Sequence, residues 1–202
     1  HENVRRRIIE PFLAMARGER DRNWWLTTTN NWNAVCLAGV TGSTLALADS
    51  RLERAEVVVA AEQYSRNLLR GFTGGGYCTE GVGYWNYGFG HYVQLAECIY
   101  QATDGEVDLL SRPSVRPPAT YGVRIEIING VCPAFADCSV GSEPSADILY
   151  FVSRRLGLGL REYEQRDVAR PAGRLPKTLM YSFPNSASRA EVAEKPSDGP
   201  GP

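Results

Sequence analysis

Helical spacing of apolar residues is the feature that most constrains how this chain of 202 residues can fold. Aliphatic and aromatic side chains recur every three or four positions in successive segments, and glycines follow where the pattern stops. The pattern predicts helices over residues 2–18, 32–48, 52–69, 85–102 and 145–156. Antiparallel helix pairs joined by glycine-rich loops favour a mainly α architecture with minor β content, as a toroid or a bundle.

The residues of two expected helices indicate how each would pack against another helix. The second carries the small residues Gly39, Gly42, Ser43 and Ala46, which would let another helix approach closely. The third has charges on one face and an apolar stripe on the other, made by Val57, Ala60, Ala61, Tyr64 and Leu68.

The rest of the chain is less regular. Prolines in residues 112–118 argue against a helix there, and residues 123–127 alternate apolar with charged side chains as a half-buried strand would. Residues 175–182 predict another short helix or strand. The composition of residues 186–202 is typical of a linker, so residues 1–185 are expected to form the helical segment, with a further domain following.

Composition and charge exclude several classes of protein. Hydrophobic content of 43% and charged content of 22% are ordinary for one globular domain, so the chain should fold. A net charge of −1 provides no long-range attraction for nucleic acid or an anionic membrane, and no apolar run reaches the ~20 residues of a membrane-spanning helix. The first residues, His1 to Arg5, form neither a signal peptide nor a natural start, so the true N-terminus is expected to be missing.

The cysteines predict structural thiols rather than a metal centre. Their number is odd and their spacings match no zinc module, so at least one thiol is unpaired or bonds elsewhere, and neither a metal ion nor a cofactor is expected. A bridge between Cys132 and Cys138 would require export of the chain. The five residues are Cys36, Cys78, Cys98, Cys132 and Cys138.

Two short clusters concentrate the side chains that could carry chemistry. The first is Asn30-Asn31-Trp32-Asn33-Ala34-Val35-Cys36, and the second is Glu80-Gly81-Val82-Gly83-Tyr84-Trp85-Asn86-Tyr87-Gly88. Amides, phenols, indoles and a carboxylate stand here where a packed helix would ordinarily have aliphatic residues. Such groups stack on sugar rings and hydrogen-bond their hydroxyls, so the clusters indicate a carbohydrate site. The glycine-rich loop of residues 72–83 can bring backbone close to a ligand.

These clusters resemble the toroid domain of the heparinase II/III-like polysaccharide lyases, a group that includes alginate lyases. The likeness covers residues 25–140, with residues 130–138 as a third similar segment. It implies a partial (α/α) toroid that lacks the family's C-terminal β-sandwich, which would supply some catalytic groups. It also implies an acidic polysaccharide or oligosaccharide as substrate and a periplasmic or secreted location.

The resemblance implies β-elimination, for which the proton at C5 of a uronate must be removed. Asn31, with Asn30 or Asn33 as alternatives, would donate to the substrate carboxylate and stabilise the developing negative charge. Tyr84 or Tyr87 would act as base, acid or both, and Tyr84 is preferred because it follows a flexible glycine stretch. The expected substrate-binding residues are Asn30, Trp32, Asn33, Glu80, Trp85 and His91.

One departure from the family pattern puts a histidine base in doubt. Many members carry histidine directly after the motif asparagine, where this chain has Trp32. His91 lies one helical turn from Tyr87 and could substitute from the same face. Plain structural roles also remain open: the asparagines as helix caps, the aromatic residues as core, and Glu80 as a solvated charge.

Two other classes of function stay open at this point. A noncatalytic carbohydrate-binding toroid would need no histidine. A toroid glycoside hydrolase would need two carboxylates flanking the bond, of which the clusters supply only Glu80.

Overall fold

The computed structural model describes residues 1–160, and this part of the chain is mainly helical. The element expected at residues 175–182 and the linker expected at residues 186–202 lie outside it. Within residues 1–160 no helix combines the length and apolarity needed to cross a membrane.

The α-helices are α1 (Glu2–Val4), α2 (Glu10–Ala16), α3 (Asn31–Leu47), α4 (Arg51–Tyr64), α5 (Arg66–Arg70), α6 (Val82–Tyr84), α7 (Gly90–Ala102), α8 (Arg116–Ala119), α9 (Tyr121–Arg124) and α10 (Ala146–Leu156). The other turns are the π-helical η1 (Arg5–Ile9) and η3 (Trp85–Phe89) and the 3-10 turns η2 (Trp24–Leu26), η4 (Leu109–Ser111) and η5 (Pro113–Val115).

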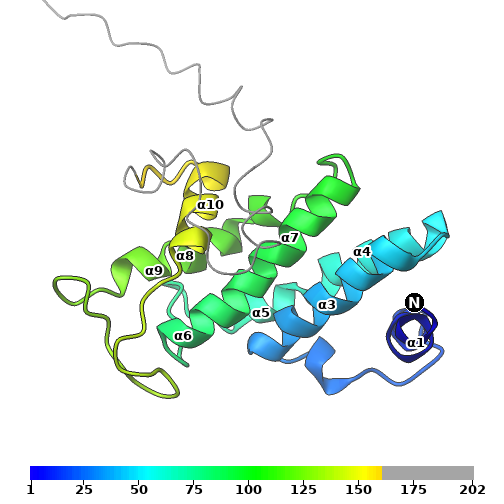
Figure 1. The fold of residues 1–202 in the computed structure, drawn as a ribbon, viewed down its shortest axis with the longest axis horizontal. Helices are drawn as coiled ribbons and strands as arrows, with labels where there is room; N and C mark the ends of the chain where they lie inside the picture. The colour runs from blue at the N-terminus through cyan, green and yellow to red at the C-terminus, as the bar shows by residue number, and fades with distance from the viewer. Residues whose placement is uncertain (161–202) are drawn as a thin grey trace, which may run out of the picture.

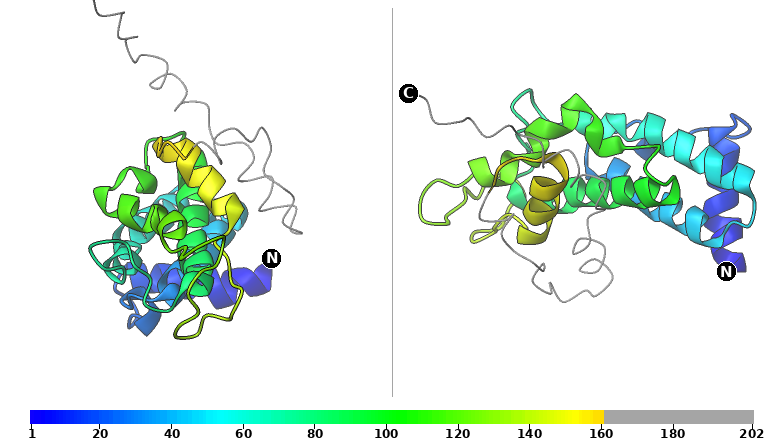
Figure 2. Two further views of the ribbon diagram at one scale, coloured as in Figure 1. Left: turned by 90° about the vertical axis from the view of Figure 1, so that its left-hand side faces the viewer. Right: turned by 90° about the horizontal axis from the view of Figure 1, so that it is seen from above.

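Three helices, α3, α4 and α7, lie side by side and form the body of the molecule (Figures 1 and 2). The first helical segment crosses one end of α3 and α4, and α8, α9 and α10 gather at the other end (Figure 1). All five segments that the periodicity predicts as helices are helical, which confirms the mainly α class.

The first segment is one helix interrupted by a wide turn. The N–H of Glu10 donates to the carbonyl of Arg5, five residues back, and Pro11 follows at once. Proline lacks an N–H and its ring crowds the carbonyl four residues before it, so the backbone widens into a π turn. The helix ends at Ala16, and Gly18 follows with a φ of +78°.

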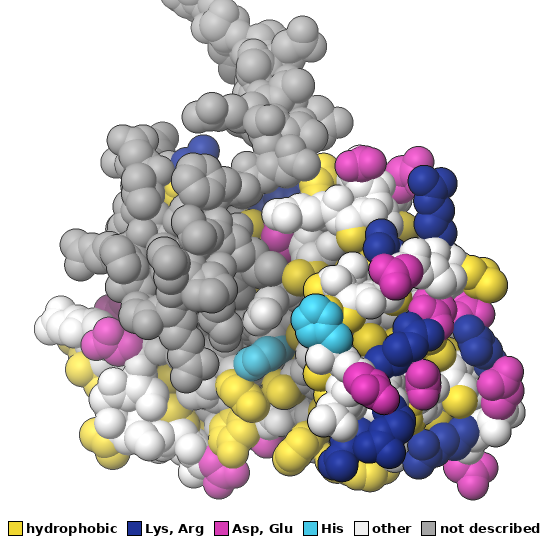
Figure 3. Space-filling model, turned by 45° about the vertical axis from the view of Figure 1, so that its right-hand side comes forward, with side chains coloured by type: hydrophobic (Ala, Val, Ile, Leu, Met, Phe, Trp, Pro, Cys, Tyr) yellow, Lys and Arg dark blue, Asp and Glu magenta, His cyan; other side chains and the backbone are white. Residues whose placement is uncertain are grey.

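The apolar stripe predicted for the third helix is confirmed, because Val57, Ala60, Ala61, Tyr64 and Leu68 are all buried. Two ion pairs hold the charged side of α4 to the first helix, Arg5 with Glu53 at 2.7 Å and Arg17 with Glu56 at 2.6 Å. Figure 3 shows arginine and acidic side chains interspersed over this end of the molecule.

The small residues of α3 do not do what the sequence predicts. Gly39 and Ala46 are exposed, and a Cβ added at Gly39 or Gly42 would meet no atom within 4 Å. The close approach to α3 occurs at Gly88 in η3, where a Cβ would lie 3.1 Å from the Cβ of Asn31. The prediction was wrong because small side chains permit close packing only on a face that meets another helix.

The fourth predicted helix begins at Val82, three residues early, and contains a π turn at Trp85–Phe89. Trp85 stacks on Phe89, with ring centroids 5.6 Å apart, and Phe89 stacks on Tyr92 at 6.1 Å. Hydrogen bonds from Trp85 Nε1 to the Pro118 carbonyl (2.8 Å) and from the Tyr92 hydroxyl to the Leu109 carbonyl (2.8 Å) connect this core to the following segment.

The predicted strand at residues 123–127 is wrong. Its first residues belong to α9, and the described part of the chain has only an isolated bridge between Ile128 and Val131. A strand needs a neighbour to satisfy its backbone, and Ile127 remains 66% exposed here. The proline-containing segment also departs from expectation, because prolines at the first positions of η5 and α8 are compatible with short helical turns.

Candidate functional site

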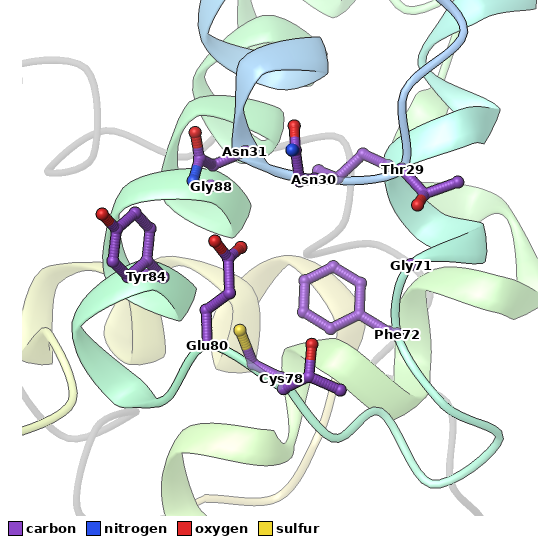
Figure 4. A pocket seen from close by; sticks show the side chains of 11 residues that line it. Thr29, Asn30, Asn31, Gly71, Phe72, Cys78, Glu80, Tyr84 and Gly88 are labelled. Atoms are coloured by element: carbon purple, nitrogen blue, oxygen red, sulfur yellow. The ribbon is translucent and has the colours of Figure 1, made fainter. Parts of the chain in front are cut away.

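A pocket of about 130 Å³ lies where the head of α3 meets the loop before α6 (Figure 4). Three separate stretches of chain build it: the start of α3, the end of α5, and the loop that leads into α6 and η3. Exposed Thr29, Asn30 and Thr79 form its solvent side. The lining residues are Thr29, Asn30, Asn31, Leu68, Gly71, Phe72, Cys78, Thr79, Glu80, Tyr84 and Gly88.

Two glycines allow these stretches to meet. A side chain at Gly71 would collide with the backbone carbonyl of Thr29, so the end of α5 reaches the α3 head only because this residue is glycine. Gly88 in η3 packs closely on Asn31, where an added Cβ would make a tight contact of 3.1 Å with the Asn31 Cβ. The glycines therefore determine how close the pocket walls come.

The adjacent asparagines have different surroundings. The side-chain oxygen of Asn30 accepts a hydrogen bond from the N–H of Trp32 at 3.2 Å and caps α3. Asn31 is 8% exposed and its amide points into the pocket (Figure 4). The capping role left open for the cluster is thus filled by Asn30, while Asn31 contributes to the pocket wall.

Glu80 extends from the loop toward Asn31 (Figure 4). Burial raises the pKa of this carboxyl and the negative charge of Asp137 raises it further, whereas a hydrogen bond from the Asn31 side chain opposes them. The net direction is upward, so Glu80 holds its proton more strongly than an exposed glutamate does.

Tyr84 is the tyrosine that lines the pocket, and its ring stands beside Glu80 and Asn31 (Figure 4). Tyr87 is 49% exposed and does not line the pocket; its ring meets His91 edge-to-face at 4.8 Å. Nδ1 of His91 donates to the Tyr87 carbonyl at 2.6 Å, and His91 does not reach the pocket either.

Asn33 and Trp85, expected to bind substrate, lie in the core with no exposed surface. The Asn33 amide donates to the carbonyls of Trp25 (3.1 Å) and Leu26 (3.0 Å), and its oxygen accepts from the N–H of Leu68 (3.3 Å). Both expectations are therefore corrected, because the turn of each helix carries these two side chains away from the pocket.

Trp32 also lies outside the pocket, on the surface. It is 52% exposed and meets Trp24, which is 59% exposed, with ring centroids 5.7 Å apart and an interplanar angle of 63°. Trp25, in contrast, stacks on Phe12 of the core at 6.1 Å.

Sequence reasoning did not select Thr29, Phe72, Cys78 and Thr79 as lining residues. The glycine-rich loop predicts close backbone approach somewhere in residues 72–83, but not which side chains turn inward. Thr29 carries a weak signal, since it directly precedes the first asparagine cluster.

A thiol lies behind the loop, at the start of α6. Gly81 has a φ of +90°, and the Cβ of Cys138 occupies the space that a side chain there would need. Burial raises the pKa of the Cys138 thiol, but hydrogen bonds from the N–H of Gly83, the side chain of Ser142 and the N–H of Val82 outweigh it and lower that pKa. All five cysteines are free thiols, Cys132 and Cys138 included.

The pocket thus unites an amide donor, a carboxyl whose pKa is raised and a phenol within reach of solvent. Such a set can bind a polar ligand and exchange protons with it. Within residues 1–160 no group of three or more histidine, cysteine, aspartate or glutamate residues is arranged to hold a metal ion. Neither the known protein-family models nor the curated proteins contain a match to this chain.

Proposed function

We propose that this chain is the toroid part of a polysaccharide lyase that cleaves uronate-containing glycans by β-elimination. In this proposal the helices form part of an (α/α) toroid, and a β-sandwich beyond them supplies further catalytic groups. The observation that supports it best is that Asn31, Glu80 and Tyr84, from two sequence clusters roughly fifty residues apart, line one small pocket.

Asn31 and Tyr84 divide the chemistry between them. The amide of Asn31 donates to the uronate carboxylate and stabilises the negative charge that develops when the C5 proton leaves. Tyr84 exchanges protons at C5 and at the leaving oxygen. Loss of one donor to a developing oxyanion typically costs about 3 kcal/mol, so Asn31→Ala should slow elimination by on the order of a hundredfold.

Binding of a uronate carboxylate by Asn31 depends on the protonation state of Glu80. It already engages the Asn31 amide, and an ionised Glu80 would repel a uronate carboxylate at the same place. Its raised pKa reduces that repulsion, because the protonated carboxyl can donate to the substrate. Glu80 therefore binds substrate best when it carries its proton.

A glycoside hydrolase is the second candidate, favoured by the influence of Asp137 on Glu80. Hydrolysis uses a pair of carboxyl groups, one of which has a raised pKa and acts as general acid. Glu80 would be that acid, and the exposed Asp137 would be the second carboxylate.

Product chemistry separates the two candidates. Elimination creates a conjugated double bond that absorbs ultraviolet light, whereas hydrolysis produces reducing ends without it. We expect uronate polymers to yield the absorbing product, with loss of that signal in Tyr84→Phe and Asn31→Ala and its retention in Tyr87→Phe. Reducing ends without absorbance would support the hydrolase, and full absorbance in Tyr84→Phe would refute the assigned role of Tyr84.

A further inference from the structure

Trp24 and Trp32 form an exposed aromatic pair that the pocket does not use. Tryptophan is highly buried on average, yet more than half of each of these side chains is open to solvent. Their edge-to-face arrangement, with centroids 5.7 Å apart, leaves indole faces available to a ligand.

The backbone beneath the pair is held in place by side-chain hydrogen bonds. Asn33 binds the carbonyls of Trp25 and Leu26, and Asn67 donates to the same Leu26 carbonyl at 2.8 Å. Asn30 holds the N–H of Trp32. Hydrogen bonds therefore anchor the backbone that carries the indoles, and each indole has only two χ angles to order in a complex.

The size of the pocket indicates what else a glycan would need. Its 130 Å³ is well below the ~300–1,000 Å³ of sites that enclose a drug-sized ligand, so only a small part of a chain can enter. Trp32 follows the pocket-lining Asn30 and Asn31 directly in the first turn of α3, so it belongs to the same helix head that forms one wall of the pocket, and Trp24 packs against it. Neighbouring sugar units would extend over this surface.

The chemistry of the pair fits a sugar ring. A pyranose presents a face of C–H groups whose partial positive charge is attracted to the negative face of an indole. Stacking of this kind leaves the hydroxyls at the ring edge free for water or for polar groups such as the Asn30 amide. The net charge of −1 gives no general attraction for the other common stacking ligand, single-stranded nucleic acid.

We propose that Trp24 and Trp32 form a stacking subsite for sugar units of a glycan whose adjacent unit occupies the pocket. This inference rests on the proposed carbohydrate function, but not on the elimination step. It makes the ligand an oligosaccharide or polymer rather than a single sugar, and it separates chain recognition at the indoles from chemistry at Asn31 and Tyr84.

Calorimetric titration with uronate oligosaccharides of graded length tests the proposal. Tyr84→Phe serves as the background, so that ligand is not consumed, and neutral oligosaccharides of the same lengths are titrated in parallel. We expect affinity to rise from disaccharide to hexasaccharide, and Trp24→Ala and Trp32→Ala to lose that rise, by on the order of tenfold for the longest ligand. Trp24→Phe and Trp32→Phe keep an aromatic face and should retain most of it. Disaccharide affinity should be the same in all variants.

Each alternative outcome has a distinct meaning. Retention of the full length dependence in both alanine variants would overturn the subsite. Absence of binding for every oligosaccharide, together with self-association that the alanine variants abolish, would make the pair a protein interface and overturn it as well. Length-dependent binding that the variants lose, in a wild-type protein without elimination activity, would uphold the subsite while removing the proposed lyase.

Discussion

Side chains that are close in the sequence of this protein have different structural roles. Asn30 caps α3, Asn31 lines the pocket and Asn33 joins three backbone groups in the core. Successive residues of a helix point about 100° apart, so a cluster in sequence becomes several environments in space. The same separation distinguishes Tyr84 in the pocket from Trp85 in the core.

Asn33→Ala should destabilise the protein far more than Asn31→Ala. The first leaves the partly buried Trp25 carbonyl and the buried Leu68 N–H without this partner, while the Leu26 carbonyl keeps its hydrogen bond from Asn67, and should lower the free energy of unfolding by about 3 kcal/mol. The second keeps the Cβ that contacts Gly88 and should cost about 1 kcal/mol or less. Urea denaturation of both variants measures the difference, and equal losses would contradict these roles.

Cys138 should be alkylated at lower pH than the other thiols. Hydrogen bonds from Gly83, Ser142 and Val82 lower its pKa against the effect of burial, whereas burial raises the pKa of the remaining four cysteines. Iodoacetamide labelling followed by mass spectrometry, across a pH series, gives the rate for each thiol. Ser142→Ala removes one donor and should move the Cys138 profile to higher pH. An unchanged profile would mean that this contact does not influence the thiol.

At the scale of helices, close approach depends on where a glycine faces. Gly88→Val should destabilise the protein by about 1–3 kcal/mol, because its Cβ would lie 3.1 Å from the Asn31 side chain and 3.3 Å from its Cα. Gly39→Val is the matched control, since no atom lies within 4 Å of its Cβ position, and should be nearly neutral. Thermal unfolding compares the two. Equal effects would show that η3 and α3 do not meet at Gly88.

Sequence periodicity was sufficient to predict the helices but not to predict which residues form the pocket. All five apolar-periodic segments are helical, because the pattern records which face is buried, a property local to each segment. The pocket depends on three segments that meet through Gly71 and Gly88, and no single segment carries that information. The same limit explains the strand expected at residues 123–127, whose alternation was real but which has no neighbouring strand among residues 1–160.

At the scale of the whole molecule, one buried carboxyl makes the stability of the helical core depend on pH. Glu97 in α7 has no exposed surface; one oxygen accepts from Gln101 at 2.6 Å, and the other has no hydrogen-bond partner among residues 1–160. Burial raises its pKa, with a smaller contribution from Asp108, against the lowering effects of Gln101 and Arg155.

Glu97→Gln should therefore change how stability depends on pH. Because the folded state binds this proton more strongly than the unfolded state, Glu97 removes stability as pH rises from about 4.3, the ordinary glutamate value, through its raised folded-state pKa. The variant cannot ionise and should be more stable than wild type at neutral pH, with the difference shrinking in acid. Denaturant midpoints across a pH series measure it. A constant difference at every pH would refute ionisation of Glu97 as the cause.

The π turn at Trp85–Phe89 has a consequence for insertions and deletions. A π turn holds about one residue more than an α turn, so it shifts the register between Val82–Tyr84 and the long helix that follows. Deleting a single residue from this turn would let a regular α-helix form while swinging the Tyr84 phenol by about 100° around the helix axis. The helix would survive that deletion, and the constellation of Tyr84, Glu80 and Asn31 would not.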